Sequence, residues 1–440
     1  MRQLSSMTWV SKSISRAKEL QLGFSIVVSI VLVGCSATHW SSSVTPDEGS
    51  IQKLLSNTRL SEREDHYFYH HQQLEMPQNV RPCCAFGNNQ QVELGKMKIP
   101  FFQLSNTVGI DDIGPHIHNA SQFTKRVDER KGKKSTENNG IVYTLRGGFI
   151  DLAHVRDTAD NTFSLFYNIY QHLGEAFTIE LPAELGERKI TFSEVDLSHL
   201  SSQDRKFVSI QLAAYYAFKM AAGHEISQWH GYESVPMFSE LVSAYSPEDL
   251  FSNMLGAKLA ANLLVDDLAR SSDDFNRHMT LWLDQALRYL GAVTKEQTAL
   301  AFEAVDGLWW DSSARIPQKY LVLKRNYNVT PIQTPLVIDS HKMAEQNYAL
   351  VANFVPLQLE PLTMSLPVSD YGVNFSLISR FTMKVDEKYR ESFAHIPEQY
   401  YPNFELDSVN FRHIAQYDKA FDQQEYAEYV VEREAKQQAK

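Results

Sequence analysis

The stretch Ile141-Val-Tyr-Thr-Leu-Arg-Gly-Gly-Phe-Ile-Asp151 decides the fold of this chain, because a strand gives way to a helix within it. The apolar, partly β-branched run at 141–145 predicts the strand. Gly147 and Gly148 then allow the backbone to turn and to approach a neighbouring segment closely. Apolar residues recur with helical spacing from Asp151 to about residue 174, and Asp151 is placed to cap this helix.

Short strands are predicted before this stretch and helices after it. The strands, separated by Gly, Pro and Asn, are expected at 91–95, 98–104 and 114–119. Helical spacing recurs at about 204–229, 246–263, 273–291 and 295–310. Beyond these lie predicted strands at 320–324, 336–338 and 374–385 and a terminal helix at 417–437. We therefore expect an α+β fold with a strand-rich N-terminal part, a five-helix middle and a mixed strand and helix C-terminal tail.

The first 35 residues have the layout of a bacterial secretory signal. Four basic residues precede an apolar run at 24–34, which is too short and too early for an ordinary membrane span. The segment Leu32-Val-Gly-Cys35 resembles a lipobox, in which the cysteine is acylated and becomes the mature N-terminus. Ser36 follows it and favours the outer membrane. We expect a lipoprotein attached through Cys35, with an ordinary signal peptide or an apolar anchor as the alternatives.

Composition indicates a globular protein with an acidic surface. The net charge is −11, and removing residues 1–34, which hold four basic residues and one acidic residue, makes it −14. Such a charge argues against nucleic acid as a partner. We expect a signal peptide at 1–34, a tether with a short helix at 35–79, a main domain at 80–340 and a C-terminal extension at 341–440.

Cys83 and Cys84 are neighbours in the sequence, so their Cα atoms lie closer together than a relaxed disulfide requires. They can form a strained vicinal disulfide, remain two buried thiols or react with another chain. A cysteine nucleophile assisted by a histidine such as His154 is a further alternative.

The first candidate site lies on the helix that follows Gly147-Gly148. Asp151, His154 and Asp157 can share one face near its start. A carboxylate beside an imidazole fixes its tautomer and raises its basicity, which suits a general base or a metal ligand. The alternative is that Asp151 only caps the helix and His154 pairs with a nearby acid.

The second candidate site is His224-Glu225-Ile-Ser-Gln228, at the end of an apolar helix face. It begins like the zinc-protease motif H-E-x-x-H, but Gln228 stands where the second histidine is required. What remains is a buried His224–Glu225 pair, which is either functional or a polar network in the core. A third pair, His116 and His118, shares one face of a predicted strand and could bind a metal.

Several of these motifs together resemble a bacterial envelope lipoprotein family known only as a domain of unknown function. They are Arg-Pro-Cys-Cys-Ala-Phe-Gly (81–87), Gly-Gly-Phe-Ile-Asp-x-x-His-x-Arg-Asp (147–157), His-Glu-Ile-x-x-Trp (224–229), Ser-Pro-Glu-Asp-Leu-Phe-Ser-Asn (246–253) and Asp-Gly-x-Trp-Trp-Asp (306–311). The resemblance covers about 80–340 and implies a lipoprotein with one domain across these motifs. It implies no activity.

The favoured hypothesis is an envelope hydrolase in which the two helical motifs meet. A divalent transition metal such as zinc would be bound by His154, His224 and one carboxylate, while Glu225 activates water. Without a metal, His154 would act as the base, oriented by an acid. The expected substrates are peptidoglycan, lipid or another lipoprotein. The alternative is a non-catalytic assembly or binding lipoprotein.

Overall fold

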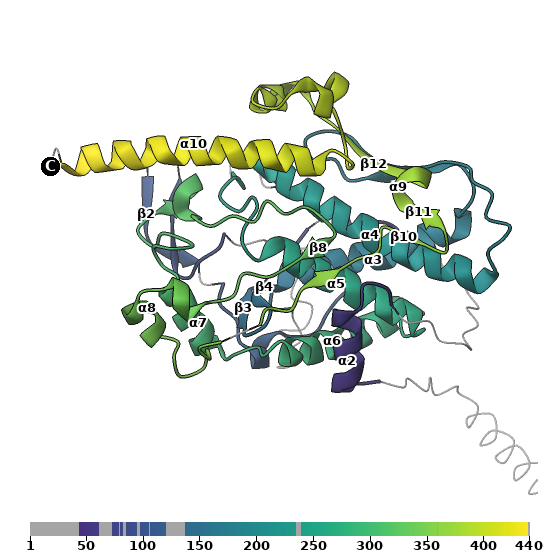
Figure 1. Ribbon diagram of the computed structural model, residues 1–440, viewed down its shortest axis with the longest axis horizontal. Helices are drawn as coiled ribbons and strands as arrows, with labels where there is room; N and C mark the ends of the chain where they lie inside the picture. The colour runs from purple at the N-terminus through teal and green to yellow at the C-terminus, as the bar shows by residue number, and fades with distance from the viewer. Residues whose placement is uncertain are drawn as a thin grey trace, which may run out of the picture. The chain divides into compact units, whose positions relative to one another are not determined.

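The structure is a computed structural model that describes residues 44–60, 73–78, 80–81, 85–94, 97–104, 106–119, 137–234, 239–358 and 360–438 (Figure 1). Residues 44–440 form one unit, and the boundary expected near residue 340 falls within it. Cys35, Cys83 and Cys84 lie outside the described residues.

The five helices expected in the middle of the chain are present, and the fold is α+β. They are α3 (Leu152–His172), α4 (Ser202–Trp229), α5 (Asp249–Val265), α6 (Ser272–Tyr289) and α7 (Lys295–Ala304). Their starts follow from local sequence, since Asp151 caps α3 and a reciprocal capping box of Thr294 and Gln297 begins α7. Helix α5 begins three residues later than the expected start at 246, and Glu248 occupies its cap position without making a side-chain capping bond.

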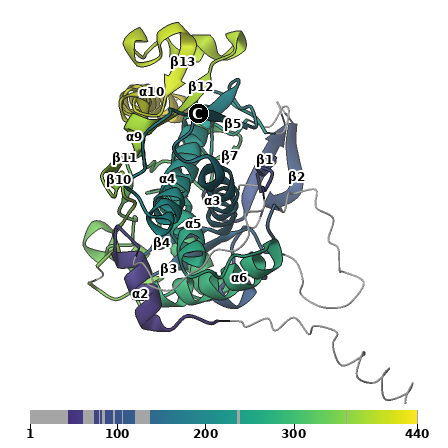
Figure 2. The ribbon, with the colours of Figure 1, turned by 90° about the vertical axis from the view of Figure 1, so that its right-hand side faces the viewer.

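Helices α3, α4 and α5 pack against one another in the core (Figure 2). Every residue of α5 except Asn262 is buried, so even its polar first turn lies in the interior. Gly256 permits the close approach of α5 to α3, because a Cβ atom there would lie 2.0 Å from the carbonyl oxygen of Val155. The start of α3 therefore packs closely against the middle of α5.

The strands form small sheets rather than one large sheet. The largest has the antiparallel order β13-β12-β6-β5, and its strands are β5 (Phe177–Leu181), β6 (Arg188–Phe192), β12 (Ser379–Lys384) and β13 (Glu405–Asp407). The hairpin of β3 (Ile141–Thr144) and β4 (Gly148–Asp151) leads into α3. The remaining strands are β1 (Gln90–Leu94), β2 (Met97–Leu104), β7 (Arg315–Ile316), β8 (Ile332–Gln333), β9 (Met364–Ser365), β10 (Ser369–Asp370) and β11 (Val373–Asn374).

Three expected strands are absent from the described residues, at 114–119, 320–324 and 336–338. In the first, the backbone N–H groups that a strand would use are taken by side chains. His116 donates to Thr280 Oγ1 at 2.9 Å, and Ile117 donates to Glu137 Oε1 at 2.7 Å. The segment is therefore a loop that is hydrogen-bonded to α6 and to Glu137.

Short helices and one long helix complete the unit. They are α2 (Glu48–Ser56), α8 (Glu345–Ala349), α9 (Phe375–Ile378) and α10 (Phe411–Gln438), with 3-10 turns at η1 (Ile110–Asp112), η3 (Lys319–Leu321), η4 (Ser340–Lys342), η5 (Glu387–Phe393), η6 (Glu398–Tyr400) and η7 (Pro402–Phe404). Helix α10 runs along one side of the unit, and its N-terminal half contacts α4 (Figure 1).

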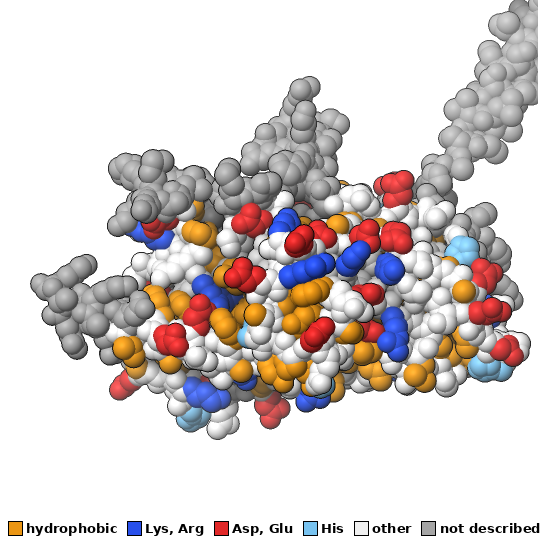
Figure 3. All heavy atoms as spheres, turned by 90° about the horizontal axis from the view of Figure 1, so that it is seen from above, with side chains coloured by type: hydrophobic (Ala, Val, Ile, Leu, Met, Phe, Trp, Pro, Cys, Tyr) orange, Lys and Arg blue, Asp and Glu red, His pale blue; other side chains and the backbone are white. Residues whose placement is uncertain are grey.

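Acidic and basic side chains are interspersed on the face seen from above Figure 1, with apolar side chains exposed between them (Figure 3). Tyr417, Phe421 and Tyr426 of α10 are among the exposed large apolar residues. None of the described helices is both long and apolar enough to cross a membrane.

Candidate metal centre

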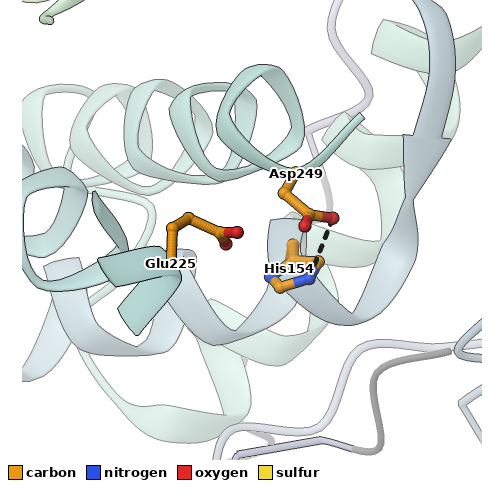
Figure 4. A group of neighbouring side chains, drawn as sticks. All are labelled: His154, Glu225 and Asp249. Carbon is orange, nitrogen blue, oxygen red and sulfur yellow. Dashed lines mark ion pairs between the residues drawn. The ribbon is translucent and has the colours of Figure 1, made fainter. Parts of the chain in front are cut away.

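Side chains from three helices converge where α3 and α5 begin and α4 ends. His154 lies in the first turn of α3, Glu225 lies near the end of α4, and Asp249 is the first residue of α5. One nitrogen or oxygen atom of each lies within 4.8 Å of the others. Figure 4 shows the three side chains turned toward one another.

Local hydrogen bonds hold two of the elements in place. Asp151 caps α3 by accepting bonds from the N–H groups of Ala153 at 2.7 Å and His154 at 3.3 Å. The backbone N–H of Tyr245 donates to Glu225 Oε2 at 2.6 Å, which directs the Glu225 carboxylate toward the other two groups. These bonds hold the start of α3 and the Glu225 carboxylate in the orientations that bring His154 and Glu225 together.

The three groups are buried and incompletely satisfied. His154 retains 7% of its surface, and Glu225 and Asp249 retain none. His154 Nε2 lies 3.2 Å from Asp249 Oδ1. Glu225 Oε1 and both carboxylate oxygens of Asp249 have no hydrogen-bond partner. Buried carboxylate oxygens without hydrogen bonds are costly, and a proton, a water or a bound cation would relieve this cost.

The pKa values of the surrounding acids show the same excess of negative charge. Burial, followed by the charge of Asp249, raises the pKa of Glu225 to about 8. Burial also raises the pKa of Asp151 to about 6, with Asp249 adding to the shift. The pKa of Glu248 is raised well above its usual range by burial and by the charges of Asp249 and Asp151. Within the described residues, none of the carboxylates of Asp151, Glu225, Glu248 and Asp249 forms an ion pair with lysine or arginine, although Asp151 lies within the electrostatic influence of Arg156.

One imidazole and two carboxylates fit a divalent transition metal. Zinc forms bonds of about 2 Å to such nitrogen and oxygen atoms, so atoms bound to one ion lie at most about 4 Å apart. Small side-chain rotations would bring His154, Glu225 and Asp249 within that range of one another. The ion would add positive charge beside these carboxylates.

The chain matches the family described as "Protein of unknown function (DUF4056)" over residues 71–339. It belongs to this family. No curated protein and no solved structure matches the chain. His154, Glu225 and Asp249 all fall within the matched residues, so the candidate metal centre belongs to the family's part of the chain.

The structure brings Asp151, His154 and Glu225 into one cluster but places Asp157 elsewhere. Asp157 Oδ1 accepts from Arg81 Nη1 at 2.7 Å, and Asp157 Oδ2 accepts from the backbone N–H of Arg81 at 2.9 Å. Arg81 also contacts Asp160 and Glu137. Although Asp157 lies one turn after His154, its contacts with Arg81 hold its carboxylate in a neighbouring charge network.

His224 also lies outside the three-ligand group. Its Nδ1 atom lies 3.0 Å from Glu184 Oε1, and its Nε2 atom lies 4.0 Å from Glu240 Oε2. Burial is the largest single influence and would lower the pKa of His224, but the charge and hydrogen bond of Glu184 together with the charges of Glu240 and Glu225 outweigh it and raise the pKa to about 9. Although His224 and Glu225 are adjacent, a helix points consecutive side chains in different directions, and only Glu225 faces His154.

Asp249 and Glu248 were not predicted as site residues. In the sequence they suggested only acids that favour a helix start. The sequence did contain a signal for their burial. The helix that begins at Asp249 is apolar on all its faces, which indicates that its first turn is buried as well. Of the predicted histidine pair, His116 contacts Asp160 at 2.9 Å and His118 contacts Ser164 at 3.2 Å.

Proposed function

We propose that this chain is a metal-dependent hydrolase of the bacterial cell envelope, anchored to the outer membrane by a lipid on Cys35. The observation that carries the proposal is the convergence of His154, Glu225 and Asp249, with their ligand atoms within 4.8 Å and with buried, partnerless carboxylate oxygens. The location rests on the signal and lipobox pattern at 1–35.

In this proposal His154, Glu225 and Asp249 bind one divalent ion such as zinc and leave at least one coordination position for water. A bound divalent metal lowers the pKa of its water toward neutrality and polarises the bond to be cleaved. His154 is the least buried of the three, with 8% of its side-chain surface exposed against 1% for Asp249, so in this proposal water enters from the side of His154. The substrates follow from the location: peptidoglycan, lipid or another lipoprotein.

Metal content tests the binding step. The full-length chain, purified in detergent, would be stripped with a chelator, loaded with zinc or manganese, desalted and analysed for bound metal. We expect near-stoichiometric metal in the wild type and its loss in His154→Ala, Glu225→Gln and Asp249→Asn. Asp157→Asn is the matched control, since its carboxylate binds Arg81 instead, and it should retain the metal.

Activity tests the catalytic step. Peptidoglycan, phospholipid and an acylated lipoprotein would each be incubated with the loaded protein, and the products would be identified by mass spectrometry. A product that requires both the metal and Glu225 supports the hydrolase. Stoichiometric metal without turnover of any of the three would instead favour a binding or assembly lipoprotein, and no bound metal would refute the metal centre.

Anchoring is tested separately by Cys35→Ser. We expect the wild-type protein in the outer-membrane fraction. The Cys35→Ser variant should lie outside that fraction and incorporate no labelled fatty acid. Fatty-acid labelling of Cys35→Ser equal to that of the wild type would refute lipidation at this residue.

A further inference from the structure

A serine, a histidine and an aspartate that the metal centre does not use meet where α4 ends. His230 is the C-cap residue of α4, Ser392 lies in the 3-10 turn η5, and Asp418 lies in α10. His230 Nδ1 lies 2.9 Å from Ser392 Oγ, and His230 Nε2 lies 3.4 Å from Asp418 Oδ1. One imidazole therefore joins a hydroxyl to a carboxylate, as in a serine-histidine-aspartate triad, with the roles of the two ring nitrogens exchanged.

Asp418 is held in place by two further groups. Its Oδ2 atom accepts from the hydroxyl of Tyr245 at 2.8 Å, and its Oδ1 atom lies 2.9 Å from His395 Nε2. Burial opposes the ionisation of Asp418, but His230, His395 and Tyr245 outweigh burial and lower its pKa. Asp418 is therefore a carboxylate, and it favours the tautomer of His230 that carries its proton on Nε2.

That tautomer leaves Nδ1 of His230 able to accept the hydroxyl proton of Ser392. Burial, followed by the charge of His395 in the same direction, lowers the pKa of His230 despite Asp418, so the ring is neutral near neutral pH. Ser392 Oγ also lies 2.7 Å from the carbonyl oxygen of Tyr389 and 3.4 Å from that of His230. Rotation of the hydroxyl about its Cβ–Oγ bond directs its one hydrogen to these oxygens or to Nδ1.

The burial of the three side chains is graded. Those of His230 and Asp418 retain none of their surface, whereas Ser392 is partly exposed. The ring of Phe393 stacks on the imidazole of His230, with 3.6 Å between the ring centroids, and holds its plane. The hydroxyl can thus meet a substrate from solvent while its base and the carboxylate remain in the interior.

We propose that Ser392 is a nucleophile for carboxylic esters, with His230 as its base and Asp418 as the positioning residue. Ser392 Oγ attacks the ester carbonyl carbon as its proton passes to His230 Nδ1. The bond from this carbon to the alcohol oxygen then breaks, and the proton moves to the leaving alcohol. Water attacks the acyl-serine in the same way, releases the carboxylic acid and restores the hydroxyl. One ester and one water thus give one acid and one alcohol, and the metal centre takes no part.

A fluorophosphonate probe tests the nucleophile. The full-length chain, in detergent with EDTA, would be incubated with the probe, and the labelled residue would be mapped by mass spectrometry; hydrolysis of p-nitrophenyl butyrate would be measured in parallel. We expect the label on Ser392, and Ser392→Ala should lower labelling and hydrolysis at least about 100-fold. Ser376→Ala is the matched control, since Ser376 is also partly exposed but bonds to Asn374, and it should keep both.

The pH dependence of labelling tests the base and the carboxylate. In the wild type the rate should rise through a pKa below the ordinary histidine value and then level off, because only neutral His230 accepts the proton. Asp418→Asn, if circular dichroism shows it folded, should react more slowly and reach its half-maximal rate at a lower pH, since the charge that favours a protonated imidazole is gone. If this variant does not fold, the wild-type profile decides.

Three results would overturn the proposal: no label on Ser392, a Ser392→Ala variant as active as the wild type, or a wild-type rate that keeps rising with hydroxide concentration. Because EDTA is present throughout, none of these results bears on the metal-dependent hydrolase. Equally, a chain that binds no metal would leave the reactivity of Ser392 unaffected.

Discussion

Glu225 is a residue at which metal binding and folding stability oppose each other. Its pKa of about 8 in the metal-free protein means that it carries a proton near neutral pH, whereas the unfolded chain, with a pKa of 4.5, is ionised there. An acid whose folded pKa is raised loses stability as pH rises above the unfolded value. The metal reverses this preference, because it binds the ionised form.

We therefore predict that Glu225→Gln, without metal at pH 7, is at least as stable as the wild type and gains up to about 3 kcal/mol. The gain should vanish near pH 4, where both states of the wild type are protonated. With metal at about one hundred times its Kd, the wild type should gain about 2.7 kcal/mol and the variant nothing. Urea unfolding at pH 7, near pH 4 and with added metal measures these three differences in stability. A metal-free variant several kcal/mol less stable than the wild type would show that Glu225 is a structural residue instead.

Glu184 lies at a second buried pair and has the opposite pH dependence. Burial opposes its ionisation, but Arg188 and then His224 outweigh burial and lower its pKa from 4.5 to about 2. A lowered acid pKa contributes stability above pH 4.5, and this contribution is lost as the pH falls through 2.

Glu184→Gln should therefore destabilise the protein by about 3 kcal/mol near neutral pH and by much less at pH 2.5. Unfolding in urea across this range checks the trend. The control is Glu180→Gln, an exposed residue of neighbouring strand β5, which should change stability little at either pH. If Glu184→Gln lowers the free energy of unfolding equally at both pH values, the lowered pKa of Glu184 is contradicted.

At the scale of elements, the contact of α3 with α5 determines whether His154 and Asp249 meet. A Cβ atom at Gly256 would lie 2.0 Å from the oxygen and 2.8 Å from the carbon of the Val155 carbonyl. These are backbone atoms, so no side-chain rotation relieves the contact and the helices must separate.

Gly256→Ala should cost about 1–3 kcal/mol of unfolding free energy and also weaken metal binding. Urea unfolding and metal titration measure the two effects. Gly49→Ala in α2 is the control, since the nearest atom to its added Cβ is 3.6 Å away in its own cap residue. Unchanged metal affinity in Gly256→Ala would show that helix spacing does not limit the site.

Local sequence predicted the helices better than it predicted the strands and the contacts between elements distant in sequence. A helix was expected at 295–310, and α7 is present with a capping box of Thr294 and Gln297, a pattern that the local sequence contains. The β5–β6 hairpin was missed, although Phe177, Ile179 and Leu181 alternate as a half-buried strand should. The expected strand at 114–119 is a loop, because its N–H groups bond to side chains distant in sequence.

The same limit applies to the site. Asp151 and His154 could be predicted together because one helix start positions both. Which face of α4 meets them depends on packing between helices, so nothing local distinguished Glu225 from His224. Asp249 enters only when α5 docks on α3, a contact between residues about one hundred positions apart in the chain.

At the scale of the whole molecule, residues beyond the family match support the site. The hydroxyl of Tyr245 donates to Asp418 Oδ2 in α10 at 2.8 Å, while the backbone N–H of the same tyrosine holds Glu225. Strand β12 lies between β6 and β13, and Phe381 of β12 packs against α4 at Gly223. The C-terminal residues therefore form part of the core that positions Glu225.

A chain ending after residue 339 keeps the whole family match and every proposed ligand, yet we predict that it does not fold. It would leave β6 as an open edge, expose the face of α4 at Gly223 and remove the acceptor of a buried tyrosine. Gel filtration, circular dichroism and metal titration would measure the loss. A chain ending after residue 431 keeps Asp418 and Asp422 and should fold and bind metal normally. A folded, metal-binding chain of residues 1–339 would show instead that the family's part of the chain builds the site without help from α10.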